Sequence, residues 1–80
     1  MRKNAEKVLK AFEKGEPCHE KTISTNGQSL YSYNMLIAYH EQNEEKTIAL
    51  VAYDRAPTAT TRSHVRAAET HLRGRITTRF

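Results

Sequence analysis

The chain has 80 residues, which is the size of one domain, and a domain this small buries only about 60–65% of its unfolded surface. With no Trp, two Phe and 38% hydrophobic residues, it can form one thin core between a sheet and two helices, which disfavours a deep catalytic cleft. No apolar run is long enough to cross a membrane, no charged-then-apolar leader is present, and the single Cys18 cannot form an internal disulfide. We therefore expect an unsecreted protein of a reducing cytoplasm.

The net charge of +4 is concentrated in the last third of the chain. Residues 1–54 carry seven Lys and Arg against eight Asp and Glu, whereas residues 55–80 carry six arginines against Glu69 alone. Because guanidinium groups bind planar, bidentate groups well, this arginine-only bias favours phosphate or carboxylate partners.

Residues 2–14 have the spacing of an amphipathic helix, which Gly15 ends and Pro17 prevents from resuming. Its expected core-facing stripe is Ala5, Val8, Leu9 and Phe12. The opposite lysine stripe is interpreted as a solvated face and, alternatively, as an edge that follows phosphates; it consists of Lys3, Lys7, Lys10 and Lys14.

The segment 16–21 is polar and is expected to be a loop. Cys18 and His19 are adjacent within it, and no second group of ligands follows at a metal-binding spacing. His64 and His71 are seven residues apart, not the four that would let both grip one ion on a helix. We therefore expect no metal and no cofactor.

A hairpin is expected at Asn26-Gly27, because a type I′ turn needs positive φ at both central residues and these residue types tolerate it. The turn would join a strand over 21–25 to a long strand over 29–39, with an irregularity near Asn34. A charged turn then leads to a third strand over 46–53. These strands predict a three-stranded antiparallel meander.

The last helix is expected over 61–73, with Thr60 or Thr61 as its cap and Gly74 as its stop signal. Its expected core face is Thr61, Val65, Ala68 and Leu72. The basic tail 74–80 could add a fourth strand or remain loose. The predicted fold is a single α+β domain, residues 1–80, with the order α-β-β-β-α.

Binding residues are expected in the basic third and among the tyrosines. Arg62, Arg66 and Arg73 fall on one face of the last helix at helical spacing and could dock on nucleic acid or on an acidic protein. Exposed tyrosines could stack on bases or anchor a protein partner. The candidate binding residues are Arg55, Arg62, Arg66, Arg73, Arg75, Tyr31 and Tyr33.

Three short motifs carry a resemblance: Phe12-x-x-Gly15, then Thr25-x-Gly27-x-x-Leu30-x-Ser32-Tyr33-x-x-x-Ile37-Ala38, then Thr60-Thr61-x-x-His64. This pattern resembles a set of small, mostly uncharacterised bacteriophage proteins and covers most of residues 12–68. Asn26 stands where that set usually has aspartate, and the arginine-rich end also departs from it. The resemblance implies a virus-encoded accessory protein in the host cytoplasm and implies no activity.

The matched residues also include a hydroxyl, a phenol and the imidazole of His64, which together could support acid–base chemistry. No carboxylate that would orient the histidine, no Gly-rich phosphate loop and no paired acids are found, so each matched residue is interpreted as structural. The sequence predicts a non-enzymatic accessory protein that binds a host or viral macromolecule, most readily a protein. RNA or DNA binding through the arginines is the alternative, and a small enzyme around His64 a third possibility. Pairing between free sheet edges could also form a homo-oligomer.

Overall fold

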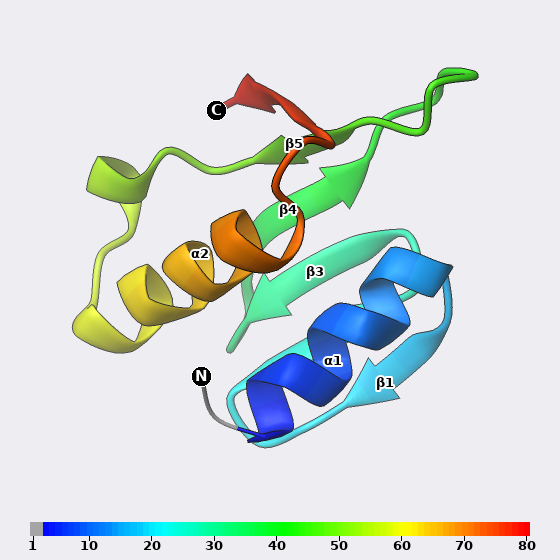
Figure 1. Cartoon of the computed structure of the whole chain (residues 1–80). Coiled ribbons are helices and arrows are strands. Elements are labelled where there is room, and N and C mark those ends of the chain that lie inside the picture. Colours follow the sequence, from blue (N-terminus) through cyan, green and yellow to red (C-terminus); the bar gives the residue numbers. More distant parts are fainter. Residues whose placement is uncertain (1–2) are drawn as a thin grey trace.

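A computed structural model describes residues 3–80 and shows how two helices and a sheet form the domain (Figure 1). The helical elements are α1 (Lys3–Lys14), the short 3-10 helix η1 (Tyr53–Arg55) and α2 (Ala59–His71). The strands are β1 (Pro17–His19), β2 (Ile23–Asn26), β3 (Ser29–Ser32), β4 (Met35–His40), β5 (Ile48–Leu50) and β6 (Ile76–Arg79).

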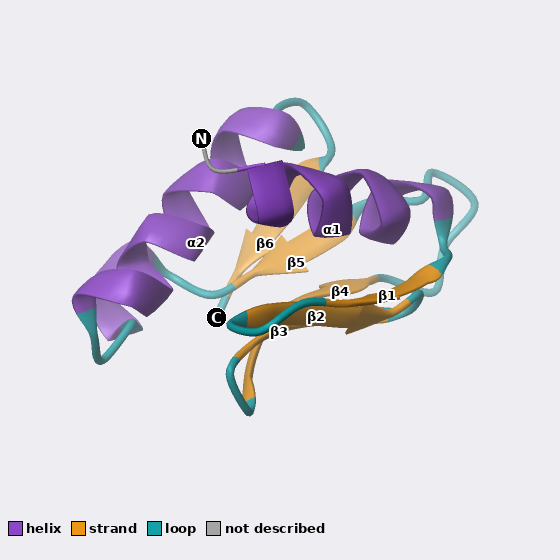
Figure 2. Cartoon of the chain, turned by 90° about the horizontal axis from the view of Figure 1, so that it is seen from below, coloured by secondary structure: helices purple, strands orange, loops and turns teal. Residues whose placement is uncertain are grey.

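The described strands form one six-stranded sheet in the order β1-β2-β3-β4-β5-β6. Neighbouring strands are antiparallel except β5 and β6, which are parallel. Both helices pack on the same face of this sheet, as Figure 2 shows. The α+β class is confirmed, whereas the three-stranded meander is wrong, because the sheet has twice as many strands and is mixed.

The long strand expected over 29–39 is in fact a hairpin, β3 and β4. Ser32 pairs with Met35, so Tyr33 and Asn34 form a two-residue turn between the strands. Tyr33 adopts a positive φ of 56°, a conformation that a bulky side chain rarely takes. The turn contains no glycine, and the residue that carries the positive φ is a strand-favouring tyrosine, so Asn34 indicated an irregularity within one strand but not a reversal of the chain.

The hairpin between β2 and β3 is where the sequence places it, but its turn is shifted by one residue. Thr25 pairs with Leu30, and Gly27, with φ of 99°, takes the first central position of the turn. This sign pattern is that of a type II′ turn, not the type I′ turn expected at Asn26-Gly27. Asn26 caps the turn instead, because its Oδ1 accepts hydrogen bonds from the N–H groups of Gln28 (2.9 Å) and Ser29 (2.8 Å).

Two strands form in segments where none was firmly expected. The predicted loop 16–21 contains β1, a short edge strand that pairs with β2 and lies against α1. The tail contains β6, which reaches back to pair with β5 across a register shift and forms the opposite edge. β1 has only three residues, too few to show a strand pattern, and β6 pairs with a strand distant in sequence, so local signals missed β1 and left β6 open.

The core lies between the helices and the sheet. Both predicted helix stripes are buried, as are Leu30, Ile48 and Leu50 of the sheet. The helix α2 starts two residues before the predicted 61, because Thr58 is the cap and its Oγ1 accepts the N–H of Thr61 at 3.1 Å. At the end of α1, a Cβ built on Gly27 would lie 2.6 Å from the carbonyl oxygen of Gly15, so backbone packs directly on backbone there.

Candidate functional site

Three of the candidate arginines lie around η1 and the start of α2. The guanidinium of Arg62 donates to the carbonyl of Ala56 at 3.3 Å, and that of Arg66 lies 4.7 Å from the centre of the Tyr53 ring. The backbone N–H of Arg55, in η1 itself, donates to the carbonyl of Ala52 at 2.9 Å, but its guanidinium makes no ion pair or hydrogen bond within residues 3–80. Two of these three cations therefore hold η1 against α2.

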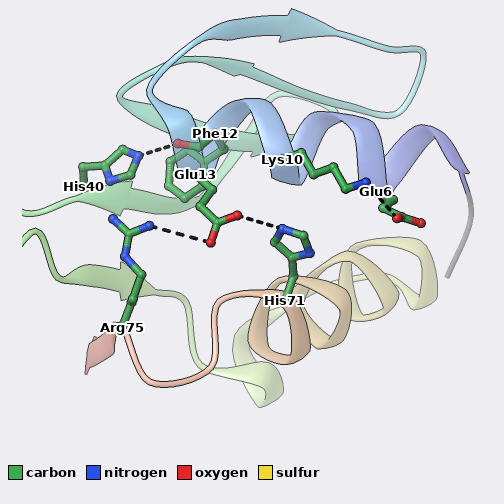
Figure 3. Close-up of polar contacts among 7 residues, drawn as sticks. All are labelled: Glu6, Lys10, Phe12, Glu13, His40, His71 and Arg75. Atoms are coloured by element: carbon green, nitrogen blue, oxygen red, sulfur yellow. Dashed lines mark hydrogen bonds and ion pairs between the residues drawn. The ribbon is translucent and has the colours of Figure 1, made fainter.

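The other arginines lie at the far end of α2. Arg75 donates to the carbonyl of Lys46 at 3.0 Å and lies 4.0 Å from the carboxylate of Glu13. That carboxylate also contacts His71 at 3.2 Å, so Glu13 ties the C-terminal ends of both helices together (Figure 3). Arg73 is exposed beyond the end of the helix.

The predicted arginine stripe is thus not one continuous surface. The helix ends at His71, before Arg73, and Glu69 falls within the same helical row and pairs with Arg79 at 2.8 Å. Tyr31 lies in β3 and Tyr33 at its turn, and within residues 3–80 the one cation–π contact of an arginine is that of Arg66 with Tyr53. The structure therefore does not unite the candidate residues in one site.

A broad depression of about 740 Å³ lies beside the Glu13 cluster. His40 lines it, stacks on the Phe12 ring at 4.3 Å and donates from Nε2 to the Phe12 carbonyl at 2.6 Å (Figure 3). Its lining mixes acidic and basic side chains, several of which already bind one another. No single charge dominates the depression, so its chemistry selects no class of ligand.

The face of the sheet that carries neither described helix bears mainly neutral side chains, and we call it the helix-free face. Residues opposite each other in antiparallel strands share a face, which places Ser24, Tyr31 and Leu36 in one row and Ser29, Tyr39 and Ala49 in the next. Phe80 borders this face: its ring lies 5.6 Å from that of Tyr39, and the residue is partly buried against the core. Ala49 is fully buried within its row, and the residues that alternate with the two rows point toward the helices.

The sequence signal for this face is the absence of charge. No Lys, Arg, Asp or Glu occurs from Thr22 to Tyr39, although 28% of the chain is charged. This segment forms β2, β3 and β4, the centre of the sheet. Sequence reasoning singled out Tyr31 and Tyr33 there but missed Leu36, Tyr39 and Phe80, since their common face depends on the β3–β4 hairpin.

A chain of hydrogen bonds, which we call the hydroxyl relay, joins α2 to β3. The Thr58 hydroxyl donates to Thr61 Oγ1 at 3.1 Å, Thr61 Oγ1 lies 3.0 Å from Ser32 Oγ, and Ser32 Oγ lies 2.7 Å from His64 Nδ1. Thr61 Oγ1 accepts from Thr58, whereas either atom can be the donor in the Thr61–Ser32 and Ser32–His64 hydrogen bonds. Ser32 therefore links Thr61 and His64 of α2 through its one hydroxyl.

The relay is buried, and this limits its chemistry. Ser32 is only 1% exposed and is not among the residues that line the adjacent groove of about 390 Å³, which His64, Lys21 and Ser63 do line. A serine nucleophile must reach its substrate, so this hydroxyl is placed to link strand and helix rather than to attack. The pairing of strand with helix agrees with the structural interpretation of the matched motif residues.

Cys18 and His19 do not point to a common site. They are successive residues of β1, so their side chains leave opposite faces of the sheet. Cys18 packs against the core, whereas His19 is exposed. Within the described residues, no group of three or more His, Cys, Asp or Glu side chains is close enough to hold a metal ion.

Glu41, directly after β4, holds neighbouring segments of the chain together. Its carboxylate accepts hydrogen bonds from Thr47 (2.7 Å), Thr77 (2.8 Å) and Thr78 (3.0 Å). These bonds, that of Thr47 foremost, hold the pKa of Glu41 below its ordinary value of 4.5. Glu41 therefore fastens the β4–β5 loop and the edge strand β6 together.

No protein-family model, curated protein or solved structure matches this chain. Neither of the α-helices described has the length and apolar character needed to span a membrane.

Proposed function

We propose that this chain is a small, non-catalytic binding protein that docks a partner protein on the helix-free face. The observation that carries the proposal is the charge-free segment Thr22–Tyr39, which forms the centre of that face. Depletion of charge together with enrichment in aromatic residues is the compositional mark of the centre of a protein interface. The motif resemblance to small bacteriophage proteins further supports a virus-encoded accessory role in the host cytoplasm.

The chemistry of the face favours a protein over a nucleic acid. Binding a phosphate backbone relies on Lys and Arg, and no arginine or lysine lies in the central strands of the face. Four arginines of the basic third instead bind groups of their own chain: Arg62, Arg66, Arg75 and Arg79.

The face also fits a separate partner better than a second copy of the chain. Its side chains are largely Tyr and Ser, which suit transient contacts, whereas obligate homodimers bury more apolar surface. Pairing through sheet edges is disfavoured as well, since β1 is short and begins with Pro17, and β6 pairs across a register shift.

The test is affinity capture from nuclease-treated host lysate, quantified by mass spectrometry. Wild type is compared with Leu36→Asp, on the helix-free face, and with the matched control Thr70→Asp, on the exposed side of α2. We expect Leu36→Asp to reduce capture of a defined protein at least tenfold, because a carboxylate would be desolvated in the contact, and Thr70→Asp to leave it unchanged. Melting temperatures of both variants verify that they fold.

Two outcomes would overturn the proposal. Equal capture by wild type and a folded Leu36→Asp variant would show that the helix-free face does not bind the partner. Capture of proteins from untreated lysate but of none from nuclease-treated lysate, together with binding of a labelled single-stranded oligonucleotide at low salt, would transfer the function to nucleic acid and the arginines.

A further inference from the structure

Tyr33 combines a strained backbone with an exposed side chain. It holds a φ of 56° at the first central position of the β3–β4 turn, and its side chain is 53% exposed. Glycine takes the corresponding position of the β2–β3 turn, as Gly27. A left-handed backbone is unfavourable for a side chain with a Cβ and especially for a bulky one.

The fold gains little from the ring of Tyr33 in return. Only the backbone N–H of Tyr33 has a described hydrogen bond, to the carbonyl of Thr22 at 2.8 Å, and any residue except proline could donate it. Strained residues of this kind cluster at functional sites. The ring is therefore the part of Tyr33 for which a function is to be sought.

The position of the turn connects Tyr33 with the helix-free face. The turn lies one residue pair beyond Tyr31 and Leu36 of that face, after the Ser32–Met35 pair. Leu36 is 37% exposed, so two of the most exposed large hydrophobic side chains described lie within one hairpin. From Ser29 to Tyr39 this hairpin contains no Lys, Arg, Asp or Glu.

We propose that Tyr33 is the anchor residue of the docking surface. Its ring would insert into an apolar pocket of the partner protein, and a polar group of that pocket would bind the phenol hydroxyl. An aromatic residue that enters a desolvated pocket commonly contributes a large share of binding energy. The absence of charged residues from Ser29 to Tyr39 fits an uncharged pocket rim. This inference rests on the proposed function and names the residue that dominates it.

The experiment separates backbone strain from binding. Tyr33→Gly and Tyr33→Asn are compared with Tyr33→Phe and with the control Tyr53→Ser, which removes an exposed tyrosine from η1. The probe is the protein that wild type captures, identified by mass spectrometry, purified and titrated by calorimetry. Thermal melting is measured in parallel without the probe.

We expect Tyr33→Gly and Tyr33→Asn to melt at or above the wild-type temperature, since both residues tolerate positive φ. The same variants should bind the probe at least about 30-fold more weakly, the loss typical of a dominant interface residue. Tyr33→Phe should retain most of the affinity, and Tyr53→Ser all of it.

Each contrary result has a distinct meaning. If Leu36→Asp abolishes binding while Tyr33→Gly binds as wild type does, the anchor role is wrong and the proposed function stands. If both variants bind normally, or wild type captures no protein, both proposals fall. Lower melting temperatures for both Tyr33→Gly and Tyr33→Asn would show that the ring stabilises the fold and would overturn the anchor role.

Discussion

The contact between Gly15 and Gly27 makes a quantitative prediction for Gly27→Ala. The added methyl group meets two separate penalties. The φ of 99° is unfavourable for alanine by about 1–2 kcal/mol. The Cβ would also lie 2.6 Å from the Gly15 carbonyl oxygen, so the end of α1 and the hairpin must separate, at a cost of roughly 1–3 kcal/mol as for other overpacked sites.

The sum of about 2–5 kcal/mol is large against the roughly 5 kcal/mol expected for a domain of this size. The matched control is Gly74→Ala, where φ is 91° and no atom lies within 4 Å of the added Cβ. This control isolates the backbone penalty. Urea unfolding followed by circular dichroism gives the free energy of unfolding of each variant. Equal losses for Gly27→Ala and Gly74→Ala would refute the close packing of the α1 end on the hairpin.

Three further substitutions test the polar contacts. Ser32→Ala should lower the free energy of unfolding by about 1–3 kcal/mol, because Thr61 and His64 lose a shared buried partner; an unchanged value in urea unfolding would contradict the hydroxyl relay. Thr58→Ala should cost about 1 kcal/mol through loss of the α2 cap, seen as a lower urea midpoint; a midpoint at the wild-type value would count against this cap. Glu41→Gln should destabilise the protein at neutral pH. The folded pKa of Glu41 lies below 4.5, so the stability that its charge contributes is complete above pH 4.5 and is lost as the pH falls below that value. The difference in free energy of unfolding between wild type and Glu41→Gln, measured in urea, should therefore narrow only below pH 4.5. A gap independent of pH would contradict the role of its charge.

The sequence predicted those parts of the fold that local patterns determine. The buried stripes of both helices and the position of the β2–β3 hairpin are confirmed, because helical periodicity and a glycine at a turn are strong signals. The β3–β4 hairpin was missed because its turn is made by Tyr33 and Asn34 without glycine. The strand β6 was left open, since its partner β5 is distant in sequence and parallel.

The candidate site was predicted less well than the fold. Helical spacing placed Arg73 with Arg62 and Arg66, but the end of α2 at His71 and the acid Glu69 break that row. The alignment of Leu36 with Tyr31 requires the register of a hairpin that local signals did not reveal. Spacing within one element predicted which residues share a face, whereas surfaces shared by several strands could not be predicted from spacing.

The three short sequence motifs, at residues 12–15, 25–38 and 60–64, contain residues that contact one another in the fold. Gly15 approaches Gly27, and Ser32 binds both Thr61 and His64, so residues far apart in sequence meet in pairs. Such contacts explain the residue types without requiring an active site. Binding is therefore to be sought outside the motif pairs, on the helix-free face.

Site-specific photocrosslinking tests the docking face most directly. A benzophenone amino acid is placed at Leu36, on the helix-free face, or at Thr70, on the exposed side of α2, and the chain is irradiated in nuclease-treated host lysate. Docking on the helix-free face predicts one dominant crosslinked protein from position 36 that excess unlabelled wild type competes away, and no such product from position 70. A competable product from position 70 alone would place the partner on the helix layer and contradict the account.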